Sequence, residues 1–263
     1  AATLPGKREE HMRLRQIAFV AKDLEPVVAA LHAAFGLNVA YRDPAVGVYG
    51  LVNAVMPVGG DFLEVVQPVA ENASAGRYLK RRGGDAGYML IFQAPNAFEH
   101  RKRLAAQGVR LIAEHQTAAY TFTHFHPGDF NGVLTSIDTE GDGSNWQDPM
   151  GKWPPAGRDW QRHLAPPGIR SIAGATVQTR DPEAAARRWS ELLETARDGA
   201  MLQLDGAEVK FVTPIDADGT GIVGVDIAVA DPSAVLAAAR AAGLPLKGES
   251  IWICGTALTP VKA

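Results

Sequence analysis

Glu64 is the residue of this sequence with the clearest potential for proton transfer. It lies between Leu63 and Val65 in an otherwise apolar run. If this run is a strand whose face looks into a cavity, burial raises the pKa of the carboxyl group and suits it to general base catalysis. The alternative is an exposed glutamate on an edge strand, paired with an arginine. The run by itself leaves both interpretations open.

His124 and His126 form the only close pair among the seven histidines. On a strand, residues two apart face the same side. The pair could therefore supply metal ligands, or an acid or base that works near pH 7. The alternative is that His126 and Pro127 cap a loop, while His124 binds substrate or water.

Arg81 and Arg82 are neighbours in the one dense basic run of the chain. Guanidinium groups bind carboxylates and phosphates with two parallel hydrogen bonds, so these residues could hold an anion that enters a cavity. A solvated surface turn is the simpler interpretation. Cys254 has no basic neighbour to activate it and is expected to be a small buried side chain.

The elements that must position these residues recur four times along the chain. Each copy has a short β-type run, a turn with Asp or Pro, and a helix rich in alanine; the runs start at Gln16, Met89, Ala175 and Val225. A unit this small cannot bury its apolar face alone, so the copies must pack together. Further β-type runs follow each helix, in the first copy at 38–42, 46–55 and 61–68.

This order predicts an α+β fold of four β-α-β-β-β modules. Paired modules would form two domains, each a curved mixed sheet around a cup with helices outside. We expect a first domain at 13–138 that carries the active pocket and a shorter second domain at 169–263. Between them, 139–168 reads as a linker with three tryptophans, which we expect to pack on the domains because such rings bury large areas. Residues 1–12 are expected to be an N-terminal extension.

Bulk composition excludes several classes of partner. The chain has 263 residues, 46% hydrophobic and 21% charged, with a formal net charge of −3. We expect no nucleic acid and no membrane as partner, because either would need a basic face or a long apolar span. The single cysteine excludes an intrachain disulfide and favours a reducing compartment, so we expect a cytoplasmic protein. Dinucleotide, P-loop and serine-hydrolase motifs are absent from the sequence.

Several segments of the first half resemble the vicinal oxygen chelate superfamily, the glyoxalase, bleomycin-resistance and dioxygenase type. They are 16–24, 62–68, 78–89 and 126–136. The resemblance covers nearly all of 13–138 and is nearest to the poorly characterised glyoxalase-like group. It favours the cavity interpretation of Glu64.

The resemblance implies a metal site with one ligand from the first strand and one from the last strand of each module. His, Gln or Glu are its usual ligands and suit divalent transition ions. In the first module these positions are Gln16 and Glu64, which are acceptable ligands. In the second they are Met89 and Ser136, which are poor ones. No cofactor is therefore favoured, and a divalent metal at an incomplete site of Gln16 and Glu64 is the possible exception.

The corresponding positions of the second half carry no useful ligand; they are Gly174, Lys210, Gly224 and Thr259. We expect the second half to bind no metal. In the first half, Gln16 either ligates a metal or orients Glu64 by a hydrogen bond. Substrate contacts are expected from Gln16, Tyr88, Met89, Ser136 and Arg82.

The function that these residues favour is that of a glyoxalase-like small-molecule enzyme. Isomerase or lyase chemistry would proceed by proton transfer next to a carbonyl, with Glu64 as base and with His124 and His126 as further catalytic groups. The alternative is a non-catalytic binding or sequestration protein of the bleomycin-resistance type. The expected partner is a small-molecule ligand, and a homodimer is possible.

Overall fold

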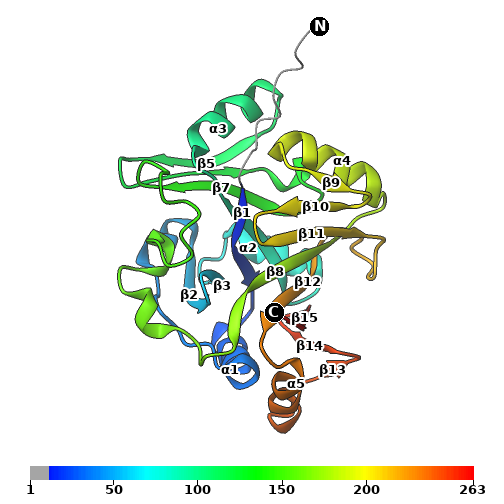
Figure 1. Ribbon diagram of the computed structural model, residues 1–263. Coiled ribbons are helices and arrows are strands. Elements are labelled where there is room, and N and C mark those ends of the chain that lie inside the picture. The colour runs from blue at the N-terminus through cyan, green and yellow to red at the C-terminus, as the bar shows by residue number, and fades with distance from the viewer. Residues whose placement is uncertain (1–11) are drawn as a thin grey trace, which may run out of the picture.

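The computed structural model describes residues 12–263. The predicted extension at 1–12 therefore lies outside the described residues, except for Met12. Two mixed sheets make up the fold, one from each half of the chain (Figure 1).

The first sheet has seven strands in the order β2-β3-β1-β4-β7-β6-β5. Its strands are β1 (Arg13–Val20), β2 (Leu51–Val58), β3 (Asp61–Pro68), β4 (Ala86–Gln93), β5 (Leu111–Gln116), β6 (Tyr120–Phe125) and β7 (Leu134–Glu140). Between them lie α1 (Leu24–Phe35), η1 (Pro44–Tyr49), α2 (Ser74–Arg82), α3 (Ala97–Ala106) and η2 (Pro127–Asp129). The antiparallel pair β1 and β4 joins the two modules at the centre of the sheet.

The second sheet has eight strands in the order β13-β14-β15-β12-β8-β11-β10-β9. Its strands are β8 (Ile169–Gln178), β9 (Arg197–Asp198), β10 (Met201–Leu204), β11 (Ala207–Val212), β12 (Gly221–Val229), β13 (Leu246–Lys247), β14 (Ser250–Ile253) and β15 (Thr256–Lys262). Its helices are α4 (Pro182–Leu193) and α5 (Pro232–Ala241), and the two halves are joined through η3 (Pro154–Ala156) and η4 (Trp160–His163). Two sheets with this module order confirm the predicted fold class.

Short-range signals in the sequence start the helices. Asp181 and Asp231 are N-caps whose side chains accept from the backbone N–H groups of Ala184 and Ala234, and a proline follows each cap. These are the residue types that favour a helix start, since they satisfy donors that the first turn leaves free. Helix α1 ends at Gly36, which adopts the left-handed conformation usual for a C-cap glycine.

The prediction of a strand at 38–42 is wrong, and the strand predicted at 46–55 begins later. Only an isolated bridge between Tyr41 and Val55 forms in the first stretch. The 3-10 helix η1 follows, with Asp43 as its N-cap and Pro44 in its first turn. Proline fixes φ and lacks an N–H, so it interrupts a strand ladder. Strand β2 consequently starts at Leu51.

One apolar core runs through both halves of the chain. One face of each sheet contributes to this core, together with helices α1, α3, α4 and α5. Helices α1 and α5 contact each other at one end of the molecule (Figure 1). At the interface of the halves, Trp189 of α4 packs against Phe92, Phe130 and Phe211.

The opposite face of the first sheet, which we call the cup, is covered by the segment between β7 and β8. We call this segment, residues 141–168, the strap. Its Trp153 and Trp160 are fully buried in the cup, in one cluster with Phe62 and Met89. This confirms that the tryptophan-rich segment packs on the protein, and it shows that the packing partner is the first sheet. None of the helices in residues 12–263 is long and apolar enough to cross a membrane.

Candidate functional site

Glu64 of β3 lies in the cup with only 7% of its surface exposed. Gln16 of β1 donates through Nε2 to Oε2 of Glu64 at 2.8 Å, and Asn53 of β2 donates through Nδ2 to Oε1 at 2.7 Å. The strands of both donors flank β3. Of the two interpretations of Glu64, the structure therefore has the buried one, with amide groups as its partners.

The two amides are themselves oriented by groups that can only donate. Nε1 of Trp153 donates to Oε1 of Gln16 at 2.6 Å, and the backbone N–H of Asp43 donates to Oδ1 of Asn53 at 2.7 Å. Indole and backbone N–H groups have no acceptor role. Both amides must therefore turn their NH₂ groups toward Glu64, which meets two N–H donors.

This environment acts on Glu64 in opposite directions. Burial raises the pKa of the carboxyl group, while the hydrogen bonds from Asn53 and Gln16 lower it; burial has the larger effect. The result is a carboxylate that is held in place by N–H donors and binds a proton more readily than an ordinary glutamate. Those are the properties of a general base.

A second buried carboxyl group, Asp138 of β7, lies on the same face of the sheet. Its two oxygens accept hydrogen bonds from the hydroxyls of Tyr120 and Ser136. Burial raises the pKa of Asp138 to about 7, against the lowering effect of the bonds from Ser136 and Tyr120. Burial and the neighbouring Asp138 raise the pKa of Tyr120 well above its usual range, so its phenol stays protonated at neutral pH.

Trp153 lies between the two carboxyl sites. Its indole N–H donates to Gln16. Its ring stacks on Phe62 with centroids 6.2 Å apart, and the ring of Tyr120 packs edge-on against it at 5.9 Å. Trp160 packs edge-on against Phe62 at 4.9 Å. The carboxyl groups are thus set in an aromatic wall, which is the dry environment in which electrostatic effects are strong.

Met89 and Ser136 occupy the positions in the second module that Gln16 and Glu64 occupy in the first. The register of the strands is the same in both modules. Gln16 pairs with Phe62, two positions before Glu64. Met89 pairs with Leu134, two positions before Ser136. Met89 belongs to the apolar wall of the cup. Ser136 is fully buried and donates to Asp138 and to the carbonyl of Thr123.

Tyr88, beside Met89, is half-buried and meets Tyr78 edge-on at 5.1 Å. Burial, with smaller contributions from Tyr78 and Glu64, raises its pKa to about 12. It is a neutral phenol within the electrostatic reach of Glu64.

The two histidines have different surroundings. His126 follows β6 and caps η2, where its Nδ1 accepts from the backbone N–H of Gly128 at 3.0 Å. This is the loop-capping alternative, so the structure does not place His126 with the cup residues. His124 is in register with Ser136 and stacks on Phe122 at 4.7 Å. Burial lowers the pKa of His124 to about 4, which makes it a neutral imidazole at pH 7.

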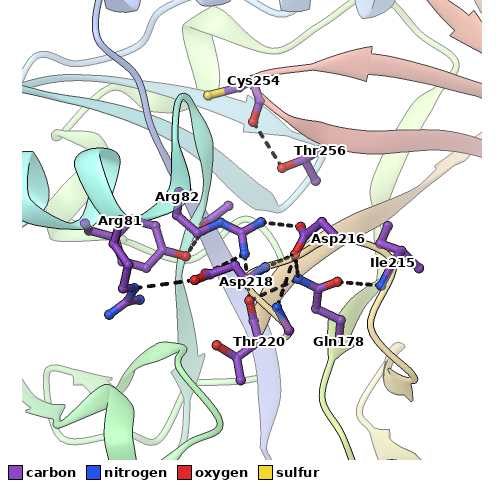
Figure 2. A network of polar contacts seen from close by, with 12 residues as sticks. Arg81, Arg82, Gln178, Ile215, Asp216, Asp218, Thr220, Cys254 and Thr256 are labelled. Atoms are coloured by element: carbon purple, nitrogen blue, oxygen red, sulfur yellow. Dashed lines mark hydrogen bonds and ion pairs between the residues drawn. The ribbon is translucent and has the colours of Figure 1, made fainter.

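Arg82 lies in a polar network that joins the two halves of the chain (Figure 2). Its guanidinium donates to Asp216 and Asp218 at 2.9 and 2.8 Å, and to the carbonyl of Thr220 at 2.8 Å. The forked group does bind carboxylates, as the sequence indicated, but they belong to the loop between β11 and β12. The expected role in substrate binding is corrected to a contact that joins the halves.

Four residues of the site were absent from the sequence-based prediction: Asn53, Tyr120, Asp138 and Trp153. Asp138 has a signal, because it follows Ser136 by two positions and strand alternation puts it on the same face. Trp153 has no such signal, because no sequence pattern in the strap indicates which side chain its indole contacts.

Comparison with known proteins agrees with this architecture. A profile of the glyoxalase-like domain matches residues 17–193, more than half of the chain. The chain belongs to the glyoxalase-like domain family. None of the curated proteins compared with it matches.

Among solved structures, a triple mutant of 4-hydroxymandelate synthase from Streptomyces coelicolor matches with a TM-score of 0.67 at 15% identity, over 89% of this chain and 76% of that one. Methylmalonyl-CoA epimerase from Mycobacterium tuberculosis matches with a TM-score of 0.43 at 23% identity, over 48% of this chain and 85% of that one. The first likeness shows that this glyoxalase-like chain has the vicinal oxygen chelate fold across both halves.

The residues at the predicted metal position do not fit a divalent ion as they stand. Oε1 of Gln16, the atom that would ligate, accepts the indole N–H of Trp153, and each oxygen of Glu64 accepts an amide N–H. The equivalent residues of the second module are a thioether and a hydroxyl. Within residues 12–263 no three His, Cys, Asp or Glu side chains are grouped as a metal site requires.

The face of the second sheet that corresponds to the cup has a cation at the ligand-equivalent position. Nζ of Lys210 donates to Asp226 at 2.9 Å. An ammonium group here disfavours a metal ion by charge repulsion.

Proposed function

We propose that the chain is a glyoxalase-like enzyme that transfers a proton next to a carbonyl group of a small molecule, in isomerase or lyase chemistry. The observation that carries this proposal is Glu64, a buried carboxylate with raised pKa, held by two amides in an aromatic cup. A base of this kind needs an acidic C–H, and a neighbouring carbonyl provides it by stabilising the carbanion as an enolate.

Glu64 would take the proton from carbon in this scheme. The enolate oxygen that develops needs a hydrogen-bond donor. His124 is a neutral imidazole on the cup face, and Tyr120 on the same face can donate once Asp138 is protonated and the hydrogen bond between them reverses. Tyr88, Met89 and Ser136 would shape the rest of the pocket. In this scheme the base and the hydrogen-bond donor are side chains of the protein, so the proton-transfer step needs no Lewis acid.

A panel of small carbonyl compounds in D₂O tests this function. Proton abstraction next to the carbonyl exchanges hydrogen for deuterium, and NMR follows the loss of the proton signal. We expect exchange with at least one class of 2-oxo acid, acyl thioester or hydroxyketone. Glu64→Gln should slow it by about 10²–10⁴-fold, the usual contribution of a general base. Glu71→Gln, at an exposed glutamate before α2, is the matched control.

The second candidate is a protein that binds a small molecule without turnover. The aromatic wall of Phe62, Trp153 and Trp160 favours it, because stacked rings bind flat apolar ligands without any acid or base. Ligand binding without exchange in the wild-type protein would support this candidate. Exchange that survives Glu64→Gln would contradict the role of Glu64 while leaving enzyme chemistry intact.

A further inference from the structure

Arg15 is a fully buried cation that forms no ion pair with a carboxylate of residues 12–263. None of its surface is exposed, and no Asp or Glu among the described residues lies within ion-pair distance of its guanidinium. Its hydrogen bonds go to the carbonyl oxygens of Pro149 and Gly151, both at 3.4 Å, and Nε has no partner. A buried charge with an unmatched donor costs folding free energy, so its retention calls for a reason.

A bulge in β1 directs Arg15 into the cup. The pairing of β1 with β4 shifts register between Leu14 and Gln16, so Arg15 is the extra residue. Its guanidinium carbon lies 5.2 Å from the ring centre of Phe62 and 5.5 Å from that of Trp153. Bulges commonly redirect a side chain beside a functional site. Arg15 thus shares the aromatic wall of the cup with the Glu64 network.

The acidic groups nearest to Arg15 are committed elsewhere or act only at a distance. Asp61 binds Arg13 at 2.6 Å and also accepts the backbone N–H of Ile172. Burial, with a smaller effect of the neighbouring Arg13, lowers the pKa of Arg15 to about 9, against the opposing fields of Asp61, Asp148 and Glu140. The guanidinium is therefore charged at neutral pH, and no carboxylate in the described part of the chain forms an ion pair with it.

We propose that Arg15 binds the carboxylate of a small organic acid, the ligand of the cup, when residues 149–151 of the strap move away from it. The inference rests on the proposed function for the location of the reacting end. Gln16 follows Arg15 in the chain and donates to Glu64, so a ligand held by its carboxylate at Arg15 extends toward the base. The carbonyls of Pro149 and Gly151 occupy the donors of Arg15 in the closed state.

The chemistry of the pocket favours a carboxylate over a phosphate. A guanidinium fork matches two coplanar carboxylate oxygens, and the guanidinium of Arg15 lies near the rings of Phe62 and Trp153, which suit a flat group. A phosphate carries up to two negative charges, and the neighbouring cation, Arg13, is already neutralised by Asp61. One unneutralised cation therefore selects a monoanion.

Isothermal titration calorimetry with 2-oxo acids and their amides tests this assignment. The probes are 2-oxobutanoate and 2-oxohexanoate against 2-oxobutanamide and 2-oxohexanamide, which keep the shape and lose the charge. Wild-type protein should bind an acid about tenfold or more tightly than its amide, as expected for a hydrogen-bonded charge pair. Arg15→Lys should remove most of that preference, because ammonium lacks the fork. Arg81→Met, at an exposed arginine, should retain it.

Two further measurements keep the result interpretable. An acid that binds should raise the melting temperature of the wild-type protein, whereas its amide should raise it less. This measurement uses the wild-type protein alone, so it does not depend on whether a variant folds. Glu64→Gln should retain the preference for the acid, so the loss of exchange and the loss of anion binding are separable. Equal affinity for acid and amide, no binding of either acid, or full acid preference in Arg15→Lys would overturn the proposal.

Discussion

At the scale of single residues, the cup combines two carboxyl groups with unlike partners. Glu64 accepts from two amides that are fixed in orientation by Trp153 and Asp43, so it is held as an acceptor. Asp138 accepts from two hydroxyls, which can reverse their direction when the carboxyl is protonated. The first arrangement suits a base and the second tolerates an acid.

The stability of the protein should depend on pH through Asp138. Its ordinary pKa is 3.8, and burial raises it to about 7 in the folded state. Between these values the unfolded chain ionises and the folded protein does not, so stability falls as pH rises from 4 to 7. At about 1.36 kcal/mol per pH unit the loss reaches at most about 4 kcal/mol.

Asp138→Asn should flatten this part of the stability curve. Urea denaturation at pH 4.5, 5.5, 6.5 and 7.5 gives the free energy of unfolding of variant and wild type. With each step to higher pH, the free energy of unfolding of the variant should rise relative to that of the wild type. Asp159→Asn, at an exposed aspartate of the strap, is the control that should leave the slope unchanged. Parallel curves for Asp138→Asn and wild type would contradict the effect of burial on this group.

At the scale of elements, the strap completes a site that the strands only outline. Strands β1, β2 and β3 supply Gln16, Asn53 and Glu64, and the strap adds the indole that orients the first of them. The strap also covers Arg15. A segment with so little regular structure can therefore control both the polarity of the site and access to it.

The two buried tryptophans of the strap should differ in what their N–H groups contribute. Trp153 donates to Gln16, whereas Nε1 of Trp160 has no partner in the described part of the chain. Trp153→Phe removes a bond and leaves a buried amide oxygen unpaired; Trp160→Phe removes only an unmatched donor. We expect Trp153→Phe to cost about 1–3 kcal/mol more unfolding free energy than Trp160→Phe. Equal losses in urea denaturation would show that the indole bond adds nothing.

At the scale of the whole molecule, the two sheets depend on close backbone contact. Gly59, in the turn between β2 and β3, has φ +59°, and a Cβ atom there would lie 1.7 Å from the carbonyl oxygen of Arg170 in β8. Arg82 fastens the same two halves through Asp216 and Asp218 (Figure 2). The first sheet and its strap thus pack against a second half that holds them in place.

Gly59→Ala should destabilise the protein because it forces the halves apart. Gly83, the C-cap of α2, is a matched control, since it has φ +71° but open space where a Cβ would lie. Both variants share the backbone strain of a left-handed alanine, so their difference isolates the clash. We expect Gly59→Ala to cost about 1–3 kcal/mol more than Gly83→Ala. Similar melting temperatures for the two variants would mean that the contact is dispensable.

The sequence by itself determined the modules and the two central site positions. Asp-Pro caps, C-cap glycines and strand alternation act over a few residues, so they can be read locally. The resemblance to the vicinal oxygen chelate superfamily pointed to Gln16 and Glu64, and to Met89 and Ser136 as the equivalent positions of the second module. The stretch at 38–50 was mispredicted because its β-type residues are outweighed by Asp43 and Pro44, which form a 3-10 helix.

Only the tertiary structure decided which polar groups meet. Trp153 and Gln16 are 137 positions apart, and Arg82 lies 134 and 136 positions from its carboxylate partners. No local pattern encodes such contacts, because they depend on how the strap and the second half pack on the first sheet. The same packing left Arg15 buried without an ion-pair partner among residues 12–263. The sequence pointed to Glu64 and Gln16, whereas the partners of these residues and the charge balance of the site followed from the fold.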